Sequence, residues 1–242
     1  MKIGNLVRSI RPAVGITNES MRERWLERTL ASIPKGSRIL DAGAGTQRYR
    51  RFCNHLNYVS HDFGEYDGKG NSAGLQTGEF NYGKLDIVSD ITCIPEVDSS
   101  FDAIMCIEVL EHLQDPVLAL REFSRLLKTN GQLVLTAPFC SLTHFAPYHF
   151  CTGFNKYWYE EHLNDHNLSI IELVANGNFF EYLAQEIYRV PCISDRYAKD
   201  RPNFLELISI YIIQRMLLRF SKKDSNSSEF LCFGYHVLAK RH

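Results

Sequence analysis

The chain has 242 residues, of which 45% are hydrophobic and 23% are charged, a composition typical of a soluble globular protein. This length is enough for one sizeable α/β domain and short for two independent domains. A net charge of −1 argues against nucleic acid as an obligatory partner of the whole surface, and no uninterrupted apolar stretch is long enough to span a bilayer.

Seven cysteines are spread along the chain without any Cys-x-x-Cys pair. This pattern is neither a zinc-site spacing nor a disulfide framework, and an odd count fits a reducing compartment. Residues 1–11 lack the long apolar core of a secretory signal. We therefore expect a cytoplasmic protein.

Hydrophobic periodicity predicts strands that alternate with helices along the chain. Residues 63–84, rich in Gly, Asn, Asp and Ser, are expected to form a surface loop. The alternation indicates a largely parallel sheet with right-handed crossovers. We expect helices over 20–33, 46–56 and 116–128, and strands over 38–41, 57–62, 85–91, 101–107, 132–137, 169–175 and 230–240.

The first expected strand ends on an acid and turns through two glycines. Gly43 and Gly45 lack a Cβ, so the backbone can turn tightly there and approach a ligand. Asp41 lies at the carboxyl end of the strand, where open α/β sheets bind ligands. A dinucleotide-binding loop would require a third glycine at the position of Arg48. A carboxylate at position 41 would also repel a pyrophosphate, whereas it would suit a ligand that carries an ammonium group.

Asp62 ends the next expected strand, 19 residues after Gly43. A carboxylate at this place can accept hydrogen bonds from both hydroxyls of a ribose. Taken alone it would be a solvated loop residue. In combination with the acid and the glycines at 41–45, we favour the ribose-binding role.

The acid-x-Gly-x-Gly order at 41–45 resembles motif I of the class I S-adenosylmethionine (SAM)-dependent methyltransferases. Farther along, Glu-Val-Leu-Glu-His at 108–112, Asp-Pro at 115–116 and Leu-Leu-Lys-x-x-Gly at 126–131 closely resemble the type 11 branch of this family. That branch acts mostly on small molecules and lipid-linked metabolites. The resemblance covers about residues 36–165, with five motifs in the expected order.

The resemblance implies a Rossmann-like α/β fold with a mostly parallel seven-stranded sheet, helices on both faces and the two last strands near one edge. The whole chain, 1–242, is then one methyltransferase domain. Within it we expect an N-terminal helical extension over 1–35, a cofactor-binding core over 36–140, and a substrate lid with the C-terminal half over 141–242.

The resemblance also implies SAM as the cofactor, with its methionine half cradled by the acid and glycines of motif I. An acid after the third strand would meet the amino group of adenine while the next residue packs on the ring, and Asp90 and Ile91 match this pattern. Ile107 ends the fourth strand at the same crevice. One residue departs from the family: Gln47 stands where a third glycine is usual, a position that we expect to tighten helix packing. The cofactor-binding set is therefore Asp41, Gly43, Gly45, Asp62, Asp90, Ile91 and Ile107.

Glu108 and Glu111 would lie one turn apart in a helix and could be interpreted as a general acid–base pair. The resemblance instead implies that this turn lines the cofactor crevice, with His112 packed behind it.

Histidines and aromatic residues gather after the fifth strand, between 139 and 159, and predict a substrate lid. Tyr148, His149 and Trp158 are its candidate acceptor-binding residues, and His149 is the candidate catalytic base because histidine takes a proton near neutral pH. The alternative is a packed aromatic cap with hydrogen-bonded histidines, which we favour for His144. We expect no metal, because the nearby carboxylates do not form a facial set at recognisable spacing.

Residues 203–220 are apolar on most sides and are followed by Lys222 and Lys223. Such a segment could make peripheral contact with a membrane over 203–223 and reach a lipid-linked acceptor. A core helix or a homodimer contact is the alternative that we favour.

These patterns together predict transfer of a methyl group from SAM to a small-molecule acceptor, lipid- or sugar-linked, by O- or C-methylation. An in-line displacement mainly requires that donor and acceptor be aligned in a dry site. A non-catalytic SAM-binding protein is an alternative that only Gln47 favours. A second alternative, an NAD-dependent oxidoreductase, is disfavoured by Arg48 and by the acid before Gly43.

Overall fold

The computed structural model describes residues 14–242, so the first part of the expected 1–35 extension lies outside the described residues. Contacts group the chain into two compact units. The sheet unit comprises Arg22–Val174 and Gly234–His242, and the helical unit comprises Ala175–Phe233 with the described residues before Arg22. A single domain over 1–242, divided near 35 and 140, stays a prediction.

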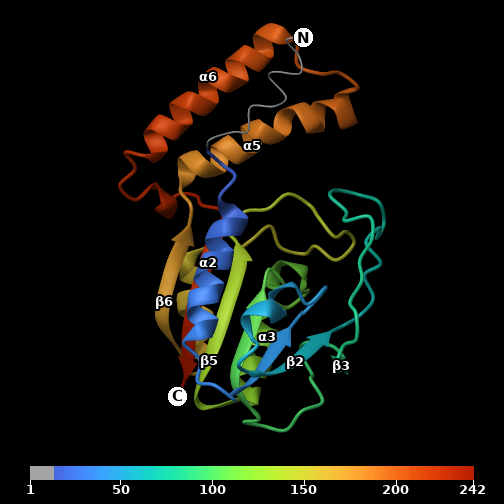
Figure 1. Cartoon of the computed structure of the whole chain (residues 1–242), viewed down its shortest axis with the longest axis vertical. Helices are drawn as coiled ribbons and strands as arrows, with labels where there is room; N and C mark the ends of the chain where they lie inside the picture. Colours follow the sequence, from blue (N-terminus) through green and yellow to red (C-terminus); the bar gives the residue numbers. More distant parts are fainter. Residues whose placement is uncertain (1–13) are drawn as a thin grey trace. The chain divides into compact units, whose positions relative to one another are not determined.

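Seven strands form one sheet in the order β3-β2-β1-β4-β5-β7-β6 (Figure 1). The pairs β1–β2, β1–β4, β2–β3 and β4–β5 are parallel, and β5–β7 is antiparallel. The mostly parallel seven-stranded sheet is therefore confirmed, as are the two late strands at one edge. The strands are β1 (Arg38–Ala42), β2 (Asn57–Asp62), β3 (Ile87–Val88), β4 (Phe101–Ile107), β5 (Leu127–Pro138), β6 (Leu168–Asn176) and β7 (Gly234–Arg241).

Helices connect these strands and cover the sheet. The expected start of α3 is confirmed at Asp115, whose side chain accepts hydrogen bonds from the first backbone N–H groups of the helix. The α-helices are α2 (Asn18–Ala31), α3 (Pro116–Leu126), α4 (Lys156–Asp165), α5 (Phe179–Ile193) and α6 (Phe204–Ser221); shorter turns are η1 (Arg48–Phe52), η2 (Leu110–His112), η3 (Ser194–Ala198) and η4 (Ser227–Glu229).

Both faces of the sheet are buried. Leu26 and Leu30 of α2 share an apolar cluster with Ile39 of β1. Because side chains alternate along a strand, the neighbouring Leu40 points to the opposite face, where it and Ile104 of β4, paired with it in register, are completely buried. The alternation explains why the central strands contain nearly continuous apolar runs.

Two expected elements are shorter in the structure than predicted. The helix expected over 46–56 is only the 3-10 helix η1. Gln47 before it adopts a left-handed conformation with φ 56°, so the helix cannot begin before Arg48. The strand expected over 85–91 is only β3. Asp86 before it accepts hydrogen bonds from the backbone and hydroxyl of Ser60, and Asp90 after it closes a turn onto Thr92, so the ladder is confined to two residues.

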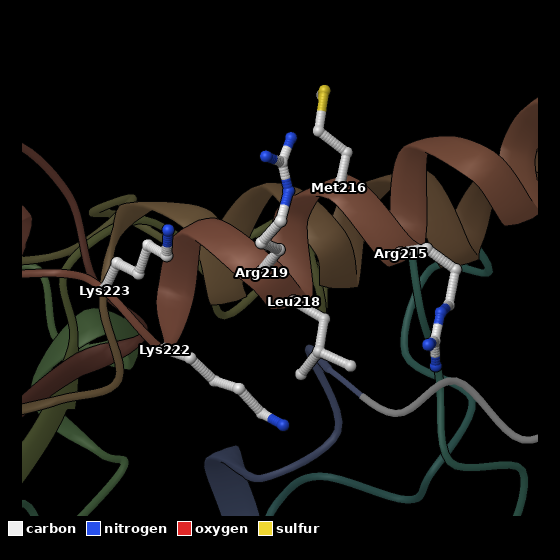
Figure 2. Close-up of a pocket in the computed structure, with 6 residues that line it drawn as sticks. All are labelled: Arg215, Met216, Leu218, Arg219, Lys222 and Lys223. Carbon is white, nitrogen blue, oxygen red and sulfur yellow. The ribbon is translucent and has the colours of Figure 1, made fainter.

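In the helical unit, α5 packs against α6. Val14, Ala184 and Leu217 form its apolar cluster, and the Gln214 side chain donates to the Ala184 carbonyl at 2.6 Å. Among the residues of α6 only Gln214 and Leu217 are buried, so a fully buried core helix over 203–220 is wrong. Figure 2 shows the cationic side chains that gather on its last turns. Across residues 14–242, the structure contains no helix long and apolar enough to cross a membrane.

Candidate cofactor and acceptor site

The glycine turn after β1 is held against the end of β2. The backbone N–H groups of Gly43 and Ala44 both donate to the His61 carbonyl, at 2.9 and 2.8 Å. Gly43 has φ 82°, and a Cβ on it would lie 2.5 Å from a methyl carbon of Val109. Any side chain here would displace the segment after β4, so glycine is required for backbone conformation and for space.

Asp62 stands directly beside this turn. One of its carboxylate oxygens accepts from the Gly45 N–H at 2.8 Å and the other accepts from the Gly64 N–H at 3.1 Å. The two bonds fix the orientation of the buried carboxylate. Each oxygen retains acceptor capacity for a further donor, as binding of ribose hydroxyls requires.

Asp41 is buried and accepts a hydrogen bond from the Tyr58 hydroxyl at 2.5 Å. Burial and the nearby Asp62 charge raise the pKa of Asp41 to about 7, against the opposing effect of the Tyr58 hydrogen bond. In the structure, its hydrogen bond with Tyr58 joins β1 to β2 beneath the glycine turn. Contact between this carboxylate and a ligand's ammonium group stays a prediction.

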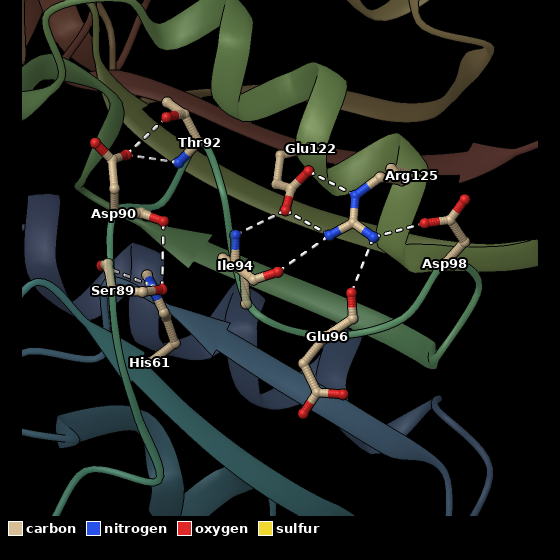
Figure 3. Close-up of polar contacts among 9 residues, drawn as sticks. All are labelled: His61, Ser89, Asp90, Thr92, Ile94, Glu96, Asp98, Glu122 and Arg125. Carbon is tan, nitrogen blue, oxygen red and sulfur yellow. Dashed lines mark hydrogen bonds and ion pairs between the residues drawn. The ribbon is translucent and has the colours of Figure 1, made fainter.

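Asp90 lies one strand farther from the turn. One carboxylate oxygen accepts from both the N–H and the hydroxyl of Thr92, each at 2.8 Å (Figure 3), and these bonds lower the pKa of Asp90. The backbone N–H of the preceding Ser89 donates to the Asp62 carbonyl at 3.2 Å, so the ribose and adenine candidates occupy neighbouring strand ends. Ile91 and Ile107 are both buried.

Gln47 has a backbone role that the sequence did not reveal. Its left-handed conformation is one that glycine adopts without steric cost, so a glycine here would suit the backbone, and the expected role of this position in helix packing stays a prediction. Its side-chain amide donates to the carbonyls of Tyr82 and Lys84, both at 2.8 Å. Gln47 thereby ties the 63–84 loop to the glycine turn.

Aromatic residues of that loop cover the turn, which a surface-loop prediction did not anticipate. Phe80 approaches Gly45, where an added Cβ would lie 3.1 Å from its ring. The Phe80 ring packs edge-on against Tyr66 and Phe145, with centroid distances of 5.2 and 5.7 Å. The loop and the lid therefore share one aromatic cluster beside the glycine turn.

The structure separates the three predicted acceptor-binding residues. The His149 Nε2 lies 3.1 Å from the Ser141 hydroxyl, and burial together with the His144 charge lowers the pKa of His149. Tyr148 packs against Phe63 from the loop, with ring centroids 5.1 Å apart. The ring contacts of Trp158 lie instead within residues 154–162, and acceptor binding by these three residues stays a prediction.

Glu108 and Glu111 serve different partners, so they are not an acid–base pair. Glu108 forms an ion pair with Arg22 at 2.7 Å and accepts from the Thr136 hydroxyl at 2.9 Å. Glu111 is 1% exposed, and one of its oxygens lies 3.7 Å from His112 Nε2 and 3.8 Å from His144 Nε2.

The sequence did not reveal this grouping of one carboxylate and two histidines, because it joins η2 to the lid. Glu111 and His144 are 33 positions apart in the chain. The structure thus gathers a carboxylate and two histidines that the spacing of the carboxylates in the sequence did not indicate, and the absence of a metal stays a prediction. Burial and the neighbouring His144 lower the pKa of His112 to about 4. Burial also acts to lower the pKa of His144, but the Glu111 carboxylate outweighs it and raises that pKa.

Residues 17–174 match the family model of a methyltransferase domain, and the chain belongs to this family. The family confirms the class I methyltransferase that the motifs predict, with SAM as its cofactor. The glycine turn fits this cofactor, because it brings two residues without a Cβ and an oriented carboxylate to the end of parallel strands.

Two curated relatives show how far the similarity extends. A demethylmenaquinone methyltransferase from Renibacterium salmoninarum is 31% identical over 159 residues, which cover 61% of this chain and 62% of that protein. A ubiquinone biosynthesis O-methyltransferase from Xanthomonas oryzae is 49% identical over 41 residues, 17% of each chain. The chain thus spans less than two thirds of either relative.

Solved structures show the same fold at low sequence identity. A phosphoethanolamine N-methyltransferase 2 from Haemonchus contortus, in complex with SAM, has a TM-score of 0.52 and 16% identity, and the match covers 91% of this chain and 52% of that one. A geranyl diphosphate methyltransferase, in complex with its diphosphate and sinefungin, has a TM-score of 0.52 and 13% identity over 93% and 79% of the two chains.

Proposed function

We propose that this protein transfers the methyl group of SAM to a small-molecule acceptor by O- or C-methylation. The observation that carries the proposal is the bond between the Gly45 N–H and Asp62, which would join the methionine and ribose halves of a SAM site in a chain of the methyltransferase family. The curated relatives, named for quinone methylation, support an acceptor of low molecular mass.

The residues of this chain align donor and acceptor. Asp62 and Asp90 would hold the ribose and adenine, and the glycine turn would hold the methionine half. When bound, SAM supplies an electrophilic methyl carbon on a sulfonium. The aromatic cluster of loop and lid would exclude water from the displacement. His149 is neutral near pH 7 because its pKa is lowered, so it can accept a proton from an acceptor hydroxyl.

Binding of SAM is tested by calorimetry with Asp62→Asn beside Asp86→Asn as a matched control. Asp86 is also a carboxylate at a strand end, but its partner is Ser60. Loss of hydrogen bonds to a charged acceptor should weaken SAM binding by about 10–100-fold in Asp62→Asn alone. Equal SAM affinities in both variants would remove Asp62 from the site, and NAD binding in a parallel titration would favour an oxidoreductase.

Turnover is tested with SAM that carries an isotopically labelled methyl group, incubated with a cell extract. Mass spectrometry should find an extract component that gains the label only in the presence of the protein. A chain that binds SAM but labels nothing would be a non-catalytic SAM-binding protein. His149→Gln should slow turnover with little change in SAM affinity if the acceptor is a hydroxyl.

We further propose that the acceptor is a membrane-held molecule, and that the protein contacts the membrane through one stripe of residues on α6. Leu205, Ile208, Ile212 and Met216 are all exposed, the first to 73%, and their spacing places them on one side of the helix. The stripe continues into Arg219 and Lys223. These residues help line a cavity of 590 Å³ (Figure 2), together with Arg215, Met216, Leu218 and Lys222.

Charge complementarity favours an anionic lipid surface over a second copy of the chain. The single acid within α6, Glu206, is held in the capping box with Asn203, so the stripe offers no carboxylate to neutralise a partner's cations. An apolar stripe that ends in cations suits the interface of anionic lipids.

Sedimentation with phosphatidylcholine vesicles, with and without phosphatidylglycerol, tests this contact. Binding should require the anionic lipid. Since each basic residue contributes about 1 kcal/mol near an anionic surface, the charge reversal Arg219→Glu with Lys223→Glu should weaken binding by more than about tenfold. Lys199→Glu, outside the stripe, is the control. Equal binding to vesicles with and without the anionic lipid would contradict the proposed membrane contact. A stable dimer in the absence of vesicles would contradict it as well.

A further inference from the structure

We propose that Glu111, His112 and His144 bind a divalent transition-metal ion, and that this ion receives the oxygen of the methyl acceptor. The use of the ion rests on the proposed methyl transfer, whereas the ion site itself rests on the geometry of these three side chains.

The three ligand atoms already converge. One Glu111 carboxylate oxygen and the Nε2 atoms of His112 and His144 lie within 4.8 Å of one another, with the carboxylate 3.7 and 3.8 Å from the two nitrogens. Ligands about 2.1 Å from a common ion lie about 3–3.5 Å apart. Small side-chain rotations would therefore complete the set.

Hydrogen bonds on the far side of each ring orient the two histidines as ligands. The Nδ1 of His112 faces the Tyr148 carbonyl, and the Nδ1 of His144 lies 2.8 Å from the Leu142 carbonyl. A carbonyl only accepts, so each Nδ1 carries a hydrogen, and the Nε2 of each ring faces Glu111 and offers its lone pair there when the ring is neutral. A metal-binding histidine typically has this second bond to a carbonyl.

Glu111 needs a positive charge beside it. It is 1% exposed, and its second carboxylate oxygen has no hydrogen-bond partner among the described residues. An ionised carboxylate buried in this way is unfavourable unless a cation lies beside it, either a metal ion among the three side chains or a proton on His144. The backbone is not free to relieve this, because the Glu111 carbonyl accepts from the N–H groups of Phe150 and Cys151 at 2.9 and 3.2 Å.

The donor set selects the class of ion. Two imidazoles and one carboxylate suit Zn²⁺, Fe²⁺ or Co²⁺, whereas Mg²⁺ prefers oxygen ligands alone. Three protein ligands leave a position open for another molecule.

The position of the cluster connects it to methyl transfer. The Phe145 ring lies 5.1 Å from the His112 ring and 5.7 Å from Phe80, which covers Gly45. An acceptor hydroxyl on the ion would lose its proton more readily, and His149, with its ring 4.8 Å from His144, can take that proton. The acceptor oxygen then bonds to the methyl carbon as the carbon–sulfur bond breaks, and the sulfonium becomes a neutral thioether.

The test uses the full chain, stripped of metal by a chelator and titrated with Co²⁺ and Zn²⁺. One equivalent of Co²⁺ should bind and give the visible absorption of a nitrogen- and oxygen-ligated ion. His144→Ala, which removes a lid side chain, and Glu111→Gln should weaken binding by more than about 100-fold, since outer-shell partners of metal ligands alone contribute 10–100-fold. His162→Ala, a histidine of α4, should bind the ion as the unmodified chain does.

The absence of stoichiometric binding, or equal binding by His144→Ala and His162→Ala, would overturn the site and leave a shared proton between Glu111 and His144 as the buried cation. SAM binding is measured on the same samples. A chain that binds SAM but no metal contradicts the ion site alone, and a chain that binds metal but no SAM contradicts the proposed function and the use of the ion in it, but not the ion site.

Discussion

Gln47 combines an unfavourable backbone conformation with a useful side chain. The left-handed conformation costs a non-glycine residue about 1–2 kcal/mol. Against this, its amide makes two hydrogen bonds to the 63–84 loop, each worth about 1 kcal/mol. The two effects are similar in size, so the residue is better understood as a clamp on the loop than as a stabilising substitution.

We expect Gln47→Gly to change the free energy of unfolding by less than about 1 kcal/mol, because relief of the backbone offsets the lost hydrogen bonds. Hydrogen exchange of residues 63–84 should nevertheless become faster. Gln47→Asn, which keeps a side chain tolerant of the left-handed conformation but is too short to reach both carbonyls, should also loosen the loop. Unchanged exchange in both variants would show that the loop does not depend on this clamp.

Asp41 predicts a pH dependence of stability. Its folded pKa is about 7, against about 3.9 in an unfolded chain. Between these values the folded protein holds a proton that the unfolded chain has released, so stability falls as the pH rises from 4 to 7.

Asp41→Asn removes this titration and retains a hydrogen-bond acceptor for Tyr58. Its stability relative to the unmodified protein should rise with pH between 4 and 7, by at most about 1.4 kcal/mol per pH unit, and should level off above that range. Chemical denaturation at several pH values measures the difference, in which the histidines common to both proteins cancel. A difference independent of pH would mean that Asp41 is ionised throughout.

At the scale of elements, Arg125 of α3 organises the segment between β3 and β4 (Figure 3). Its guanidinium contacts the carboxylates of Glu122 and Asp98 and the carbonyls of Ile94 and Glu96. Glu122 also accepts from the Ile94 N–H at 2.8 Å. The network fixes the chain that leads away from the adenine candidate Asp90.

Removal of Glu122 should therefore be more harmful than removal of Asp98. The Glu122 side chain is 8% exposed and the Asp98 side chain is 76% exposed. Glu122→Ala leaves a buried N–H unpaired, which should cost about 1–3 kcal/mol, whereas Asp98→Ala loses an exposed ion pair worth less than about 1 kcal/mol. Denaturant midpoints would compare them, and equal losses would contradict the importance of burial here.

The central strands, α2 and α3 followed from local patterns because their causes are local, whereas the sequence did not predict α4 and α5. The sequence itself contains the apolar runs of β1 and β4 and the Asp115-Pro116 start of α3. The lengths of η1 and β3 were not predictable, since they depend on the conformation of Gln47 and on the pairing of Asp86 with Ser60.

At the scale of the whole molecule, binding of the cofactor should increase the free energy of unfolding. A ligand that binds only the folded state stabilises it by about 2.7 kcal/mol at one hundred times its dissociation constant. The thermal midpoint should therefore rise with SAM concentration, while NAD at the same concentrations should leave it unchanged. A rise with NAD and none with SAM would contradict the assignment of the cofactor.

The sequence by itself determined the sheet, the glycine turn and the acids at the strand ends, because a parallel sheet brings the carboxyl ends of its strands together whatever the loops do. Only the tertiary structure decided which loop residues meet there. Phe80 over Gly45, the clamp of Gln47 and the approach of His144 to Glu111 join segments far apart in the chain. Their proximity depends on how the loop and the lid fold back over the sheet. No local pattern in the sequence predicts the path that these segments take.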